Sequence, residues 1–115
     1  MTDIPRLIVE ALRPTGIRVD FMTLRTSTAP DQYITYMETS DVPEESAGDA
    51  VTVKGRYVQL NIWSKGPYYQ LVQKVSDLMN AAGFEETLSA DVDQDAGSTY
   101  QNRVMRFTYL DEIGG

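Results

Sequence analysis

Residues 56–83 read RYVQLNIWSKGPYYQLVQKVSDLMNAAG, and two different periods of apolar side chains meet in this stretch. In the first part, apolar and polar side chains alternate, which is typical of a strand with one buried face (Val58, Leu60 and Ile62). In the second part, the apolar side chains share one helical arc of about 120° (Tyr68, Leu71, Val72, Val75, Leu78, Met79 and Ala82). Gly66-Pro67 separates the two parts, and Gly83 is a suitable helix end. The stretch therefore predicts a strand over 51–64 and a helix over 67–82.

A second helix is predicted over residues 3–13, with apolar side chains at helical spacing. Asp3 can cap its start, and Arg13-Pro14 ends it because a residue before proline avoids the helical region. Alternating or β-branched stretches predict further strands over residues 17–21, 31–39, 85–91 and 98–110. A change of parity near Gly55 to Val58 predicts a β-bulge or a strong twist in the strand 51–64.

The two apolar helix stripes need a common surface to cover. We therefore predict an α+β fold in which two helices pack on one face of an antiparallel sheet of four to five strands. A chain of 115 residues is the length of one domain, so residues 1–115 are expected to form a single unit. Polar composition predicts three segments outside the helices and strands: an acidic loop over 40–50, an acidic turn over 91–97 and a flexible tail over 111–115.

Composition excludes several chemistries. The chain has no cysteine and no histidine, which excludes disulfides, Cys/His zinc sites, cysteine nucleophiles and histidine acid–base catalysis. Seventeen acids stand against ten bases, and the bases are scattered singly, so we expect no binding to nucleic acid or to an anionic membrane. No apolar run is long enough to span a membrane, and residues 1–12 lack the pattern of a secretory signal. The chain is therefore expected to remain in the cytoplasm where it is made.

Three groups of acidic residues are candidates for a catalytic or metal-binding site. Carboxylate pairs at Glu44-Glu45 and Glu85-Glu86 could serve as an acid and a base, but both lie in polar contexts without an apolar pocket in sequence. Residues 91–97 resemble the start of a calcium loop, but Ala96 replaces its glycine and Asn102 its glutamate. A solvated turn is the better interpretation. We expect no catalytic residue, no metal ligand and no cofactor.

The aromatic residues leave two interpretations open. Trp63, at the end of a predicted strand, can be an anchor of the core or an aromatic residue of a protein interface. The chain also has seven tyrosines, which suit half-buried strand positions or subunit contacts.

A family resemblance rests on Arg56–Ser64 (RYVQLNIWS), on the amphipathic helix that follows, and on Tyr33-Ile34-Thr35-Tyr36. This order of elements, over about residues 4–110, is similar to that of the phage tail-completion family, also described as tail-terminator or head-tail joining proteins. The resemblance implies a structural protein of the virion, assembled in the bacterial cytoplasm, that forms a ring, commonly a hexamer. Its implied partners are further copies of itself, the tail-tube proteins and the head-connector proteins.

No catalytic residue comes with this family. An acidic ring lumen would suit passage of DNA, because repulsion keeps DNA from adhering. The two acidic segments are therefore candidates for lumen or partner contacts, with Glu44 and Glu45 in the first and Asp91, Asp93 and Asp95 in the second.

Two other classes of function remain as alternatives. A small cytoplasmic protein-binding module would accept a peptide strand at an exposed sheet edge. A small enzyme with a carboxylate pair would need a concave pocket and a carboxyl group whose pKa is raised by burial.

Overall fold

A computed structural model describes residues 2–43, 53–94 and 97–112 of the chain. Three of the candidate acids, Glu44, Glu45 and Asp95, lie outside the described residues.

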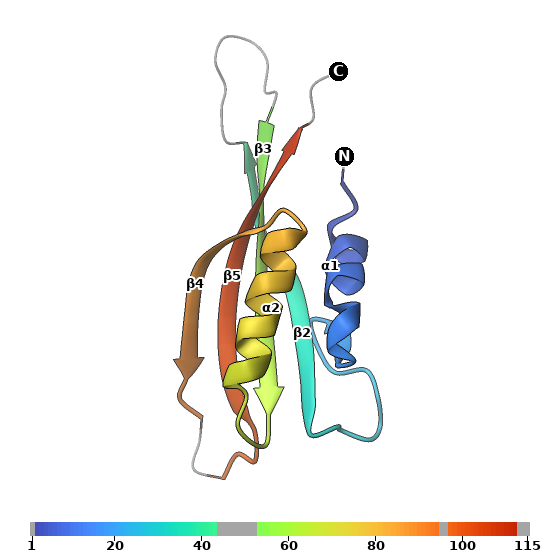
Figure 1. Ribbon diagram of the computed structural model, residues 1–115, viewed down its shortest axis with the longest axis vertical. Helices are drawn as coiled ribbons and strands as arrows, with labels where there is room; N and C mark the ends of the chain where they lie inside the picture. Colours follow the sequence, from blue (N-terminus) through green and yellow to red (C-terminus); the bar gives the residue numbers. More distant parts are fainter. Residues whose placement is uncertain (1, 44–52, 95–96, 113–115) are drawn as a thin grey trace.

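The fold is α+β, as predicted, with two helices on one face of a five-stranded sheet (Figure 1). The helices are α1 (Ile4–Leu12), which continues into the 3₁₀ turn η1 (Arg13–Thr15), and α2 (Tyr69–Ala81). The strands are β1 (Arg18–Phe21), β2 (Gln32–Pro43), β3 (Val53–Ser64), β4 (Glu85–Val92) and β5 (Gln101–Glu112). Their order across the sheet is β1-β2-β3-β5-β4.

The core lies between the helices and the sheet, and it contains the predicted apolar stripes. α1 is capped by Asp3, whose carboxylate accepts a hydrogen bond from the Arg6 amide at 3.2 Å. The fully buried core side chains come from both helices and from the central strands (Ile4, Ile8, Leu12, Ile34, Val58, Leu60, Ile62, Val75, Met79, Met105 and Phe107). Burial of each such side chain contributes about 1.5–3 kcal/mol before the loss of chain entropy is counted.

The sheet is mixed, which differs from the predicted antiparallel sheet. β1 pairs in parallel with β2, while every other pair is antiparallel. Residues 22–31 carry the chain back along β1, and Met22 adopts a positive φ of 63° at the start of this return. The Asp20 carboxylate supports the return by accepting a hydrogen bond from the Arg25 amide at 3.1 Å. Because this turn uses methionine where glycine is usual, the sequence does not mark it.

An irregularity of pairing lies at the level predicted for a bulge, but in the neighbouring strand. Glu38 pairs with Val58 and Asp41 pairs with Arg56, so Thr39 and Ser40 of β2 together face Tyr57 of β3. Of the two alternatives predicted for the strand 51–64, the bulge is therefore wrong, because the additional residue lies in β2. The predicted loop 40–50 also begins too early, because β2 continues to Pro43. Pairing with β3 satisfies the backbone of these residues despite their polar composition.

The predicted tail over 111–115 also begins too early, because β5 extends through Glu112. Asp111 is only 4% exposed and accepts a hydrogen bond from the Arg56 guanidinium at 2.9 Å. Arg56, itself 7% exposed, binds Glu38 as well, with Nη2 and Oε1 2.8 Å apart. The Thr2 amide and hydroxyl donate to the two oxygens of Asp111 at 3.0 and 2.9 Å. These contacts form a buried charged cluster that joins the N-terminal segment to β2, β3 and β5.

Candidate functional site

Aromatic side chains gather at the end of the molecule where β3 ends and α2 begins. Because β2 and β5 both run antiparallel to β3, each of them starts at this end. The turn after β3 then carries the chain across this end into α2 (Figure 1). We call this surface the aromatic end, and define it by Tyr33, Trp63, Tyr68, Tyr69 and Tyr100.

One half of the aromatic end lies on the sheet face that the helices leave uncovered. Trp63 stacks on Tyr33 of the neighbouring strand, with ring centroids 5.9 Å apart and planes at 15°. Tyr100 meets Tyr33 edge-on at 5.3 Å, and Lys65 Nζ lies 5.5 Å from the centroid of the Tyr100 ring. The indole N–H of Trp63 donates to Thr35 Oγ1 at 3.2 Å. Trp63 is thus half-buried outside the core, which removes the core-anchor interpretation and leaves the interface interpretation.

The other half lies on the helix side, at the start of α2. Tyr68 and Tyr69 stack with centroids 5.3 Å apart, but their environments differ. Tyr68 is 5% exposed, whereas Tyr69 is 68% exposed. A large aromatic ring in contact with solvent, beside one that is fixed by burial, is the arrangement that protein interfaces favour.

Asp91, which was predicted to make lumen or partner contacts, forms a hydrogen bond and an ion pair in this half of the aromatic end. Its carboxylate accepts a hydrogen bond from the Tyr68 hydroxyl and pairs with Arg103 Nη1 at 2.9 Å. The hydrogen bonds from Tyr68 and Arg103 hold the pKa of Asp91 below its usual value. Burial, together with the hydrogen bond to Asp91 and its charge, raises the pKa of Tyr68 to about 12. The Arg103 guanidinium also donates to Ser89 Oγ at 3.0 Å, so this cluster ties β4 and β5 to the start of α2.

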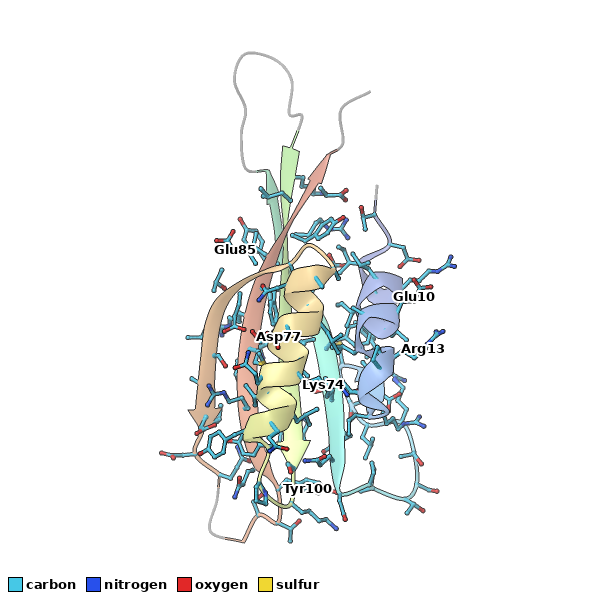
Figure 2. The ribbon with its side chains drawn as sticks, in the orientation of Figure 1. Glu10, Arg13, Lys74, Asp77, Glu85 and Tyr100 are labelled. Atoms are coloured by element: carbon cyan, nitrogen blue, oxygen red, sulfur yellow. The ribbon has the colours of Figure 1, made fainter. Side chains whose placement is uncertain are left out.

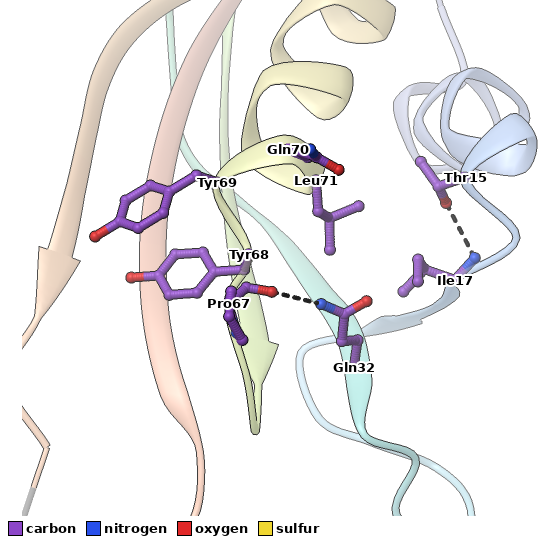
Figure 3. Close-up of a pocket in the computed structure, with 8 residues that line it drawn as sticks. All are labelled: Thr15, Ile17, Gln32, Pro67, Tyr68, Tyr69, Gln70 and Leu71. Atoms are coloured by element: carbon purple, nitrogen blue, oxygen red, sulfur yellow. Dashed lines mark hydrogen bonds between the residues drawn. The ribbon is translucent and has the colours of Figure 1, made fainter.

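A shallow groove runs along the helix side of the aromatic end and measures about 630 Å³ (Figure 3). It is lined by Thr15, Ile17, Gln32, Pro67, Tyr68, Tyr69, Gln70 and Leu71. Gln32 Nε2 donates to the Pro67 carbonyl at 3.5 Å, and Thr15 Oγ1 accepts from the Ile17 amide at 3.0 Å. Among the residues that the structure describes, this lining has neither an acidic nor a basic side chain.

A second groove of about 430 Å³ joins the two halves and contains the predicted acids Asp91 and Asp93. Asp93 is exposed there, beside Tyr69 and Tyr100. Asp91 belongs to β4 rather than to a turn, because its partner Arg103 lies opposite it in β5. Its ion pair also leaves it a poor ligand for calcium. Among the residues that the structure describes, no cluster of three or more acids could hold a metal ion.

The sequence did not indicate that Tyr68 and Asp91 are partners. They are 23 positions apart, and only the placement of α2 beside β4 brings them together. Tyr68 was predicted to belong to the apolar stripe of α2, and its burial agrees with that prediction.

The titration of Tyr68 gives a direct test of this cluster. Tyrosinate absorbance is recorded after rapid transfer to each pH, before the chain unfolds. It is expected to show a step near pH 12 that Tyr68→Phe removes. Since the folded state binds this proton more tightly than the unfolded state, the stabilisation that the group contributes is present below about pH 10 and is lost as the pH approaches 12. The control Tyr69→Phe should retain the step. An unchanged curve for Tyr68→Phe would contradict the assignment.

Comparisons with protein-family models and with curated protein sequences give no match to this chain. Neither helix in the described residues is long and apolar enough to cross a membrane.

Proposed function

We propose that this chain is a structural virion protein of a tailed phage or prophage, which closes the tail tube or joins the tail to the head as a ring-shaped oligomer. The observation that carries the proposal is where the large side chains are exposed. They lie at the two sheet edges, along β5 and at the aromatic end (Phe21, Met22, Tyr69, Leu88, Val92 and Leu110). Interfaces between proteins are built from such exposed apolar and aromatic side chains, whereas enzymes use concave pockets.

The segment that carries the family resemblance supports the same proposal. Residues 56–64 form most of the central strand β3, and the chain then turns directly into α2, which packs on the core. This is the order of strand and helix that the resemblance implies. The net charge of −7 would reduce adhesion of DNA to a ring through which it passes.

Within this proposal, the aromatic end is the surface that contacts the tail-tube or connector protein. Tyr69 is the candidate for the largest contribution, because it is well exposed and its ring already stacks on the buried Tyr68. A side chain that is held in place before binding loses less entropy when it binds.

Deletion of the gene from its phage or prophage tests the proposal. We expect particles with tails of uncontrolled length, or heads and tails that remain separate, in electron micrographs. A plasmid copy should restore infective particles. A Tyr69→Ala copy should restore at least about tenfold fewer, since truncation of a hot-spot tyrosine costs about 2 kcal/mol or more. Asn80→Ala, which truncates an exposed side chain on α2 outside this set of apolar and aromatic residues, is the matched control. Unchanged particle number and shape after deletion would overturn the proposal.

The second candidate function is a binding module that accepts a peptide strand. It is favoured by β4, which lies at the edge of the sheet with Leu88 and Val92 exposed. Light scattering over a wide range of protein concentration separates the two candidates. A ring, or an equilibrium between monomer and ring, supports the virion protein, and a monomer at every concentration favours the module.

A further inference from the structure

The two edges of the sheet carry exposed charges of opposite sign. On β4 and just beyond it, Glu85, Glu86 and Asp93 are exposed and have no ion-pair partner within the described part of the chain. Near β1, Arg13 and Arg25 are exposed and have no ion pair among residues 2–43, 53–94 and 97–112, although the Asp20 carboxylate interacts electrostatically with Arg25. Figure 2 shows Glu85 and Arg13 on opposite sides of the molecule.

Each edge also exposes apolar side chains beside its charges. Phe21 and Met22, at the end of β1, are 45% and 58% exposed. Leu88 and Val92 of β4 are 41% and 39% exposed. We call Glu85, Glu86, Leu88, Val92 and Asp93 the acidic edge, and Arg13, Phe21, Met22 and Arg25 the basic edge. Apolar groups flanked by charges of one sign on each surface are what a pair of complementary interfaces requires.

Strand direction is compatible with contact between the two edges. β1 runs parallel to β2, whereas β4 runs antiparallel to β2, since β5 lies antiparallel to both β3 and β4. When two sheets are placed side by side with their helices on the same face, β4 of one copy therefore lies antiparallel to β1 of the next. β1 has only four residues, and the Phe21 carbonyl already accepts from the Thr23 amide at 2.7 Å. Side chains rather than a long ladder of backbone hydrogen bonds must therefore supply most of the contact.

The same charges oppose pairing of an edge with itself. Two acidic edges would bring Glu85, Glu86 and Asp93 of one copy close to the same group of acids in the other, and like charges across an interface are unfavourable. Two basic edges would repel through Arg13 and Arg25 in the same way. Only unlike edges combine complementary charge with apolar contact, and a contact between unlike surfaces leads to a closed ring when the rotation between copies permits.

We propose that the acidic edge of one copy docks head to tail on the basic edge of a second copy. As the subunit contact of the ring, this inference rests on the proposed function, although the contact itself can be measured in the isolated protein. The partner is a second copy of this chain because both complementary surfaces belong to the same chain.

The test uses two variants that reverse the charge of one edge each. The first is Glu85→Lys with Glu86→Lys, and the second is Arg13→Glu with Arg25→Glu. Each variant alone has two edges of like sign, so the dissociation constant for its self-association is expected to rise at least about tenfold. The self-association of the wild type is expected to weaken as salt is added. In an equimolar mixture, each basic edge of the first variant can face an acidic edge of the second variant. The dissociation constant of the mixture should therefore return to within about threefold of the wild-type value. Sedimentation velocity or light scattering measures all four samples, and circular dichroism verifies that each variant is folded.

Overall charge cannot produce this pattern. Each Glu→Lys change adds two positive charges, so the first variant has a net charge of −7 + 4 = −3 and should repel itself less as a whole. Its weaker association would therefore report the local contact. Asp77→Lys is the control variant, because Asp77 is exposed on α2, between the two edges in Figure 2, and the change should leave association unaltered.

Three outcomes would overturn the inference. A wild-type protein that remains monomeric at the highest attainable concentration has no such contact. A second variant that associates as tightly as the wild type would show that the basic edge takes no part in the contact. A mixture that fails to associate, from folded variants, would exclude head-to-tail contact. If gene deletion gives defective particles and the protein is monomeric, the proposed function stands and this contact is excluded. If deletion leaves the particles unchanged and the protein associates as expected, the contact stands and the proposed function is excluded.

Discussion

Truncation of Phe107 to alanine is expected to lower the free energy of unfolding by about 3–5 kcal/mol, which is a large part of the stability of a small domain. Phe107 is 1% exposed at the centre of β5, where it pairs with Val58 and belongs to the core cluster that contains side chains of both helices. Its ring meets Phe84 edge-on with centroids 6.3 Å apart. The variant loses the transfer free energy of the ring and also leaves a cavity that the packed helices can fill only in part.

Denaturant unfolding followed by circular dichroism measures this effect as a shift of the midpoint. Leu110→Ala is the matched control, because Leu110 lies on the same strand but is 60% exposed. Its truncation should change stability by less than about 0.5 kcal/mol. If Phe107→Ala cost no more than Leu110→Ala, the assignment of Phe107 to the core would be wrong.

The second large effect is expected from Asp111→Asn, which should lower the free energy of unfolding by about 3 kcal/mol. The substitution keeps the shape of the side chain but leaves the buried Arg56 guanidinium without its inner charged partner. Loss of one partner from a buried ion pair usually costs about 3–5 kcal/mol, and the lower end applies because Glu38 still binds Arg56. The matched control is Asp93→Asn, which removes an exposed carboxylate and should cost less than about 0.5 kcal/mol.

The same variant changes the response to acid. Burial alone would raise the pKa of Asp111, but hydrogen bonds from Thr2 and Arg56, together with the charge of Arg56, outweigh it and lower the pKa. Because the unfolded chain binds this proton more readily, Asp111 stabilises the fold above about pH 4, and this contribution is lost as the pH falls below that value. The wild type should therefore lose more stability than Asp111→Asn between about pH 5 and pH 3. Equal losses in the two proteins would contradict the role given to Asp111.

Much of the fold could be predicted because it depends on local periodicity. The stripe from Leu71 to Met79 and the alternation through Val58 and Ile62 each identify one buried face, and both faces meet in the core. The direction of β1 could not be predicted in this way, because it depends on a return loop that starts at Met22 rather than at glycine. The extent of β5 was missed since Asp111 in an acidic, glycine-containing end resembles a tail. Its burial is made favourable by Arg56, 55 positions away, and by Thr2, 109 positions away.

The candidate site was less predictable than the fold because it depends on register. The sequence marks Tyr33, Trp63 and Tyr100 as aromatic residues on or next to strands, but it does not show that Tyr33 and Trp63 face each other across β2 and β3. Acidity alone suggested Asp91 as a contact residue, whereas the structure places it in a hydrogen-bonded cluster with Tyr68 and Arg103. Of the acids predicted to make contacts, Asp93 is the one that the structure describes as exposed and without a basic partner in the described residues.

The hydrogen bonds between Thr2 and Asp111 have a practical consequence for the handling of the protein. They hold the beginning and the end of the described chain together, at the end of the molecule opposite the start of α2 (Figure 1). A fluorescent protein or an affinity tag fused at either terminus would therefore emerge far from the aromatic end and leave it open to partners. The same closeness means that a short linker can join the two termini, so that a circularly permuted chain with new ends in another surface loop should keep the fold.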